Sequence, residues 1–131
     1  MPISIHGLCT DGIGNISPVE MNAIELKVSA FNPCESCIMG HSYLLKKEGE
    51  TGDFIQAIIA GNETTDRRIN TLLRATEYVF HADGDIFPAH ILNFLQEHIT
   101  KNELTGIIGF ISLKTISNHL NNYPASKKLV K

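Results

Sequence analysis

Three side chains that could carry out redox chemistry or hold a metal lie within one short segment of the chain. Cys34 and Cys37 are spaced C-x-x-C, and His41 follows four residues after the second cysteine. If the segment is helical, the three side chains lie on one stripe, at about 0°, 300° and 340° around the helix axis. Cys37 and His41 are then i,i+4 neighbours, and a thiol beside an imidazole is the arrangement of an activated cysteine.

The residues around this motif predict that a helix begins there. Asn32 suits the N-cap, Pro33 the first helical position and Glu35 the third position of a capping box. The free N–H groups of the first turn and the positive end of the helix dipole favour a thiolate. The helix terminus favours Cys34 as the attacking sulfur, whereas the histidine favours Cys37, so these residues alone leave the nucleophile open.

Two other interpretations fit the same residues. Cys34, Cys37 and His41 are acceptable zinc ligands around an open fourth position, although a structural zinc site would need a fourth ligand from Cys9 or another histidine. Alternatively, the cysteines are small buried apolar residues of a non-catalytic oligomeric or regulatory protein. The redox interpretation is the one that we pursue, and it requires neither a metal nor an organic cofactor. We expect Cys9 to be an incidental thiol.

Capping signals and apolar spacing predict an all-α domain of about six helices that position the motif. No segment shows the period-two alternation that is typical of a strand. The expected helices, with the residues that start or end them, are 18–31 (after Ser17, with Pro18 and Glu20), 33–47 (after Asn32), 54–60 (after Thr51 or Asp53, ended by Gly61), one from Thr64 or Thr65 to about 81, one over 87–98, and one over about 101–123 (capped by Thr100 with Glu103).

The last of these helices is apolar on most sides, so we expect it to be buried or to lie in a subunit interface. Pro124 follows its predicted end. We therefore divide the chain into an N-terminal arm (1–16), one domain (17–123) and a C-terminal tail (124–131). The helix also carries a short asparagine cluster, at Asn118, Asn121 and Asn122.

Composition sets broad limits on the class of protein. The chain has 131 residues, 43% of them hydrophobic, and a net charge of −3. This charge gives no electrostatic reason to expect nucleic acid or an anionic membrane as a partner. The first residues lack the basic and apolar segments of a signal peptide, and three cysteines do not make a secreted disulfide framework. We expect a cytoplasmic protein with one functional cysteine pair.

Two separated stretches resemble a known family. The segment from Ala23 through Cys37 to His41 is similar to the C-x-x-C-x-x-x-H signature of the carboxymuconolactone decarboxylase family, and more closely to its alkylhydroperoxidase D-like branch. The segment Leu113–Asn122 resembles the last-helix pattern of that family, and Gly61 followed by the helix with Leu72 and Leu73 resembles its middle. The resemblance covers residues from about Ser17 to Tyr123.

The resemblance implies an all-α fold, assembly into homotrimers or homohexamers, and a thiol peroxidase or disulfide oxidoreductase of antioxidant defence. Carried over, Cys37 matches the cysteine that attacks the hydroperoxide, Cys34 the resolving cysteine and His41 the histidine that assists proton transfer. A sulfenic acid would form at Cys37, and Cys34 would close the disulfide. An external dithiol of the lipoyl or thioredoxin type would then reduce the pair.

The chain departs from the family pattern at two positions. The family usually has a glutamate of a proton relay twelve residues before the first cysteine, and Asn22 occupies that position here. Glu25 lies close to the same helical face and is the residue that we expect to substitute for it, whereas Glu20 points elsewhere. The second departure is Ser36, where the peroxidase prototype has a histidine.

Overall fold

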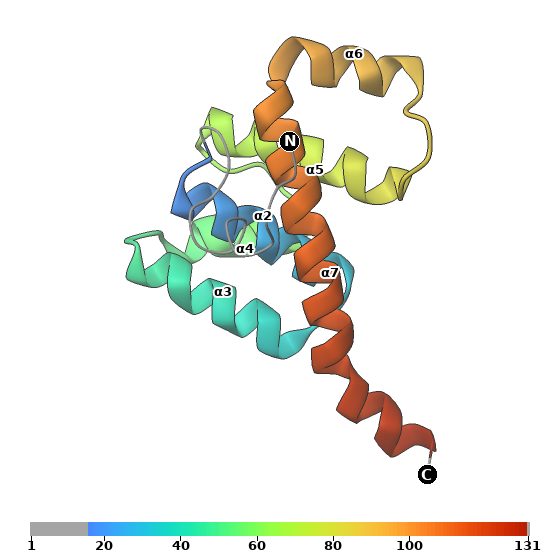
Figure 1. Cartoon of the computed structure of the whole chain (residues 1–131). Helices are drawn as coiled ribbons and strands as arrows, with labels where there is room; N and C mark the ends of the chain where they lie inside the picture. The colour runs from blue at the N-terminus through green and yellow to red at the C-terminus, as the bar shows by residue number, and fades with distance from the viewer. Residues whose placement is uncertain (1–15, 131) are drawn as a thin grey trace.

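A computed structural model describes residues 16–130, with side chains placed for 16–123. In this part of the chain there are six α-helices and no strand, as the sequence predicts (Figure 1). The helices are α2 (Pro18–Phe31), α3 (Glu35–Lys47), α4 (Gly52–Ala60), α5 (Arg67–Ala82), α6 (Ala89–His98) and α7 (Lys101–Val130). The predicted arm 1–16, apart from Ile16, and Cys9 lie outside the described residues, so the division into arm, domain and tail stays a prediction.

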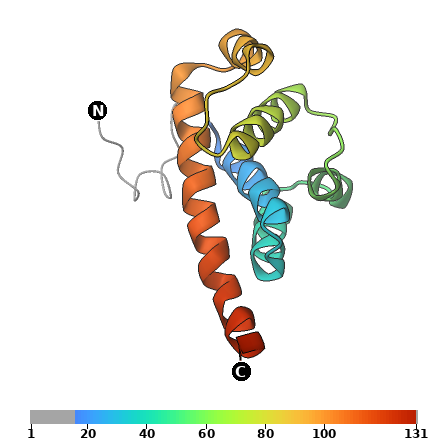
Figure 2. The same cartoon turned by 90° about the vertical axis from the view of Figure 1, so that its right-hand side faces the viewer.

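Helix α2 is the centre of the molecule. It contacts α3, α4, α5 and α7, and α7 runs alongside α2 and α3 as a long rod (Figures 1 and 2). Half of its residues are buried, and a helix buried on several sides must be apolar around most of its circumference. Its polar buried residues, Asn22, Lys27 and Ser29, each have a partner from another helix. The side chains that could do chemistry are therefore positioned against the central helix of the fold.

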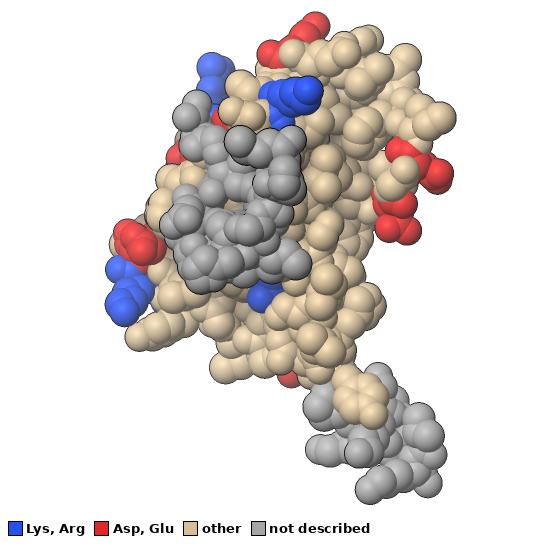
Figure 3. All heavy atoms as spheres, viewed as in Figure 1, with Lys and Arg blue, Asp and Glu red and all other residues tan. Residues whose placement is uncertain are grey.

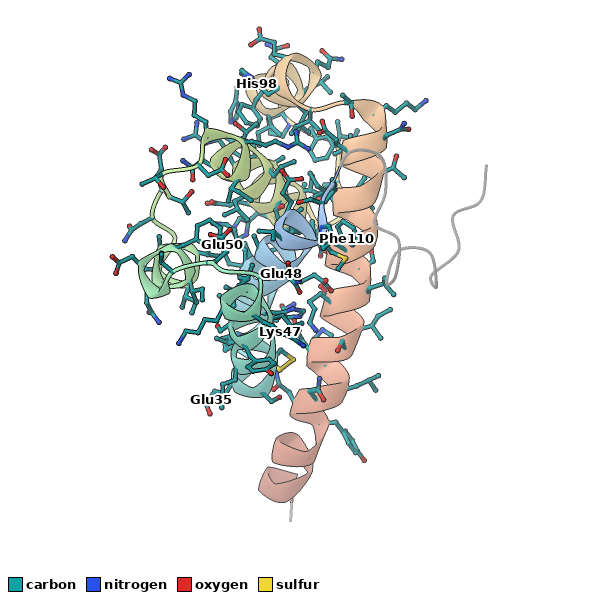
Figure 4. All side chains as sticks on the ribbon, turned by 90° about the vertical axis from the view of Figure 1, so that its left-hand side faces the viewer. Glu35, Lys47, Glu48, Glu50, His98 and Phe110 are labelled. Atoms are coloured by element: carbon teal, nitrogen blue, oxygen red, sulfur yellow. A yellow bond between two sulfur atoms is a disulfide. The ribbon has the colours of Figure 1, made fainter. Side chains whose placement is uncertain are left out.

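Helix α7 is only partly buried. Ile107 and Phe110 belong to the core, and Phe110 is among the largest fully buried side chains (Figure 4). Ile116 and Leu120 are exposed on the same helix. Within the single chain this helix is therefore not fully buried, because α2 rather than α7 takes the central place. The alternative, that the helix lies in a subunit interface, stays a prediction.

Two capping predictions are confirmed by reciprocal hydrogen bonds. Ser17 and Glu20 form a capping box at the start of α2, and Thr100 and Glu103 form another at the start of α7. Of the two residues proposed to cap the third helix, Thr51 does so, accepting from the Phe54 amide. Gly61 ends that helix in the left-handed conformation, φ 79°, which a residue without Cβ adopts freely.

Five predicted helix boundaries are wrong, the first being the start of α4, which lies at Gly52 and not at residue 54. Helix α3 begins at Glu35 with Cys34 as N-cap, and Asn32 instead ends α2. Helix α5 is capped by Asp66, whose carboxylate accepts two amides, rather than by a threonine. Helix α6 begins after Pro88, because a proline restrains the residue before it from helical angles. Helix α7 continues past the expected stop at 124 to Val130, since a proline inside a helix removes one hydrogen bond without having to end it.

An ion-pair network joins three helices near their N-termini. Arg68 of α5 lies 2.6 Å from a carboxylate oxygen of Glu20 on α2 and 2.8 Å from one of Glu103 on α7. Burial raises the pKa of Glu103, but hydrogen bonds from Thr100 and Arg68 outweigh it and lower that pKa. Glu20 is therefore held by Arg68 and by the Ser17 amide at the start of α2. No helix among the described residues is both long and apolar enough to cross a membrane.

Candidate active site

Cys34 and Cys37 form a disulfide at the start of α3, with their Cα atoms 5.3 Å apart (Figure 4). The C-x-x-C spacing brings the N-cap residue and a first-turn residue to the same side of the helix. Cys34 is 1% exposed and Cys37 is 6% exposed. Cys34 Sγ lies 3.6 Å from the Ser36 hydroxyl. The pair is thus a buried disulfide that packs against the rest of the protein.

The chain segment that leads into the motif is held by α7. The side-chain amide of Asn32 donates to Asn118 Oδ1 at 3.2 Å, and Asn118 in turn donates to the Ser29 hydroxyl at 3.3 Å. Asn122 Nδ2 donates to the carbonyl oxygen of Pro33 at 3.2 Å. The first of these bonds occupies the side chain of Asn32, which would otherwise cap α3. The asparagine cluster therefore fixes the connection between α2 and α3, and with it the position of the sulfurs.

His41 is a neutral imidazole with one free nitrogen. Its Nδ1 lies 3.1 Å from Asn22 Oδ1, and since an amide oxygen only accepts, the proton is on Nδ1. Nε2 is then left as an acceptor. Burial, reinforced by the charge of Lys114, lowers the pKa of His41 to about 4. At neutral pH this residue can accept a proton from a neighbouring acid, but it does not carry a lasting positive charge.

Glu25 is a half-buried carboxyl group on α2. Burial raises its pKa to about 7, although the charge of Lys114 acts in the opposite direction. A carboxyl group with this pKa exchanges its proton near neutral pH. Lys114 therefore acts electrostatically on both Glu25 and His41.

An open pocket of about 330 Å³ lies next to the disulfide. It is lined by residues of α3 and α7, namely Ser36, Cys37, Gly40, His41, Leu44, Lys114 and Asn121. Cys37 lines this pocket and Cys34 does not. Of the four residues expected at the site, Cys37 and His41 meet in the pocket, Cys34 lies behind as the disulfide partner, and Glu25 is outside the lining.

Neither Lys114 nor Asn121 was predicted to belong to the site, although Asn121 is part of the asparagine cluster in the sequence. Asn121 Nδ2 donates to Cys37 Sγ at 3.3 Å. The available signal was a polar stripe on an otherwise apolar helix, since positions 114, 118 and 121 follow the i, i+4, i+7 spacing of one helical face. That stripe faces the motif.

A larger pocket, of about 400 Å³, lies elsewhere and contains neither cysteine. Two of its cations are already paired, Lys27 with Glu77 at 3.7 Å and Arg74 with Glu63 at 3.8 Å. Within residues 16–130, no three histidine, cysteine or acidic side chains are grouped so that they could hold a metal ion. The chemistry therefore concentrates at the dithiol pocket.

Comparisons with known proteins agree with this fold. The model of the carboxymuconolactone decarboxylase family matches residues 7–78. A similar solved structure is the crystal structure of an uncharacterized peroxidase-related protein from Silicibacter sp. TM1040, with a TM-score of 0.78 and 16% sequence identity. The similarity covers 92% of this chain and 64% of that one, so this chain spans less than two thirds of its neighbour. No curated protein gave a match.

Proposed function

The chain belongs to the carboxymuconolactone decarboxylase family, and from this premise we propose that it is a thiol-dependent oxidoreductase that reduces hydroperoxides with Cys34 and Cys37. The observation that carries the proposal is the disulfide between these cysteines, one sulfur of which lines a pocket shared with His41. The family is named for a decarboxylase, but a paired dithiol beside an imidazole is suited to redox chemistry.

In the proposed reaction, the thiolate of Cys37 attacks one oxygen of the hydroperoxide and the O–O bond breaks. An alcohol leaves, and Cys37 becomes a sulfenic acid. The thiol of Cys34 then attacks the Cys37 sulfur, water leaves and the disulfide forms. Two thiols are oxidised, and one hydroperoxide is reduced to alcohol and water. We propose that an external dithiol of the lipoyl or thioredoxin type returns the pair to thiols by exchange.

Neutral His41 is suited to move the protons of this cycle. Its free Nε2 can accept the proton of the Cys37 thiol and return it to the departing alkoxide. Asn22, at the position of the missing glutamate, orients the ring through Nδ1 but cannot exchange a proton. We propose Glu25 as the second proton carrier, supported by its pKa of about 7.

Titration of the fully reduced, metal-free protein with a hydroperoxide tests the proposal. We expect one equivalent to be consumed, with the loss of two hydrogens in the intact mass and a Cys34–Cys37 crosslink in the peptide map. Cys37→Ser should be inert, whereas Cys34→Ser should accumulate a sulfenic acid that dimedone traps. Cys9→Ser is the matched control and should behave as wild type.

Other outcomes of this titration select the alternatives. If both thiols stay free and the peroxide survives, the peroxidase proposal fails, and a non-catalytic role is the better description. If the protein as purified carries stoichiometric zinc, the interpretation of the site as a metal-binding module replaces the peroxidase proposal.

We also propose that the protein forms a homo-oligomer through α7, as the family resemblance implies for a trimer or hexamer. Ile116, Leu120 and Tyr123 share one face of this helix and are 56%, 69% and 61% exposed. Charged side chains lie mainly at the margins of the view that looks onto α7 (Figure 3). Native mass spectrometry should show an oligomer, and Leu120→Glu should shift it toward monomer.

A further inference from the structure

Two polar side chains of α7 line the pocket that contains Cys37. Asn121 Nδ2 donates to Cys37 Sγ at 3.3 Å, and Lys114 lines the same pocket two turns earlier on the helix. The Asn121 amide nitrogen is a donor that also lies 3.4 Å from the Ser117 hydroxyl, and the Lys114 ammonium is a donor with a positive charge. A thiolate needs groups of this kind around it, because ionisation places a negative charge in a partly buried position.

His41 does not supply that positive charge. Its Nδ1–H is directed to Asn22, so only the acceptor Nε2 is left for the thiol. In the disulfide form, burial lowers the pKa of His41 to about 4, so the imidazole of this form is neutral at pH 7. A proton that Nε2 takes from the Cys37 thiol passes to water in the open pocket, and the negative charge left on the sulfur is stabilised by other groups.

We infer that Lys114 and Asn121 of α7 stabilise the thiolate of Cys37, one by charge and the other by a direct hydrogen bond. This inference rests on the proposed function, which it deepens by naming the groups that activate the nucleophile. The first turn of α3 adds its free N–H groups. The same two side chains would hydrogen-bond an oxyanion that develops in the pocket when the O–O bond breaks.

The balance of charge around Cys37 follows from the elements packed against it. The pocket lining contains Lys114 from α7 and His41 from α3, whereas Glu25 of α2 and the exposed Glu35 of α3 are outside it. Glu25 is partly protonated near neutral pH and His41 is neutral. Lys114 is therefore the charged side chain of the pocket lining, and its removal leaves the thiolate without a cation there.

The test measures the ionisation of Cys37 in the fully reduced protein, without any peroxide. The rate of alkylation of Cys37 by iodoacetamide is followed against pH by peptide mass spectrometry. We expect Lys114→Met and Asn121→Ala each to slow the reaction at pH 7 by about three- to tenfold, because the midpoint of ionisation moves to higher pH. Lys114→Arg keeps the charge and should stay close to wild type.

Matched controls come from the same helix. Lys101→Met and Asn102→Ala remove the same chemical groups from exposed positions in the first turn of α7, and neither should change the alkylation profile. Far-UV circular dichroism identifies any variant that has lost its fold. Since Lys114→Arg and Lys114→Met differ only slightly in size, a difference between their rates of Cys37 alkylation reports on the charge at position 114.

The inference is wrong if Lys114→Met and Asn121→Ala both keep the wild-type profile while His41→Asn moves it, because the imidazole would then carry the charge. This outcome is distinct from failure of the proposed function. If wild-type protein does not consume peroxide but the α7 variants still shift the alkylation profile, the site is an activated thiol with another substrate.

Discussion

Glu25 and His41 should give the folded protein opposite dependences on pH that nearly cancel. The pKa of Glu25 is raised from 4.5 to about 7, so the folded state binds its proton more tightly than the unfolded chain. Its contribution to stability is complete below pH 4.5 and is lost as the pH rises toward 7. The pKa of His41 is lowered from 6.5 to about 4, so its contribution is complete above pH 6.5 and is lost as the pH falls toward 4.

Each contribution corresponds to about 3 kcal/mol, at about 1.4 kcal/mol for each tenfold change in proton affinity. In the wild type, the stability that Glu25 loses between pH 4 and pH 8 is offset by the stability that His41 gains. Glu25→Gln removes one side of this balance. The free energy of unfolding should then rise by about 3 kcal/mol from pH 4 to pH 8, relative to the wild-type profile. His41→Asn keeps a side-chain donor for Asn22 and should give the opposite slope.

Urea denaturation of the disulfide-bonded protein, followed by far-UV circular dichroism at closely spaced pH values, measures these slopes. Glu48→Gln removes an exposed carboxyl group at the end of α3 and is the matched control, with no expected change in slope. The double variant Glu25→Gln with His41→Asn should return the flat profile. If Glu25→Gln alone keeps the wild-type profile, Glu25 is solvated and ionised normally, and its assignment as a proton carrier fails as well.

Two further predictions concern the contacts that hold the site in place. Arg68→Met leaves the buried carboxylate of Glu103 without its cation and should lower the free energy of unfolding by about 1–3 kcal/mol in chemical denaturation, whereas Arg67→Met, at an exposed neighbouring position, should change it by less than about 0.5 kcal/mol. Asn118→Ala removes the bridge between α7 and the α2–α3 connection. It should destabilise the protein by about 1–3 kcal/mol and make the disulfide easier to reduce in a dithiothreitol titration, and an unchanged reduction midpoint would show that α7 does not position the sulfurs.

Local sequence patterns were sufficient to predict most of the secondary structure. The capping boxes at Ser17 and at Thr100 join residues three positions apart, so their partners can be identified without knowledge of the fold. The pairing of Cys34 with Cys37 is local in the same sense, because the C-x-x-C spacing brings both sulfurs together at any helix start. The resemblance to the family rested on such local patterns, and the match of the family model supports it.

The cap of α3 could not be decided locally. Asn32 has the right side chain and the right position for an N-cap, but that side chain is bonded to Thr115 and Asn118, more than eighty residues further along the chain. The tertiary contact outweighs the local preference, and Cys34 becomes the N-cap instead. Nothing within a window of one helix could have indicated this.

The electrostatics of the site were also decided by packing. The sequence determined that a thiol and an imidazole lie one turn apart, and it left open which cysteine attacks. Only the packing of α3 on α7 makes Cys37 the sulfur in the pocket and brings Asn121 and Lys114 toward it. Burial, which depends on every neighbouring helix, removes the charge of His41 and keeps the proton on Glu25 near neutral pH. The sequence by itself thus determined which groups are present, and the tertiary structure decided their protonation.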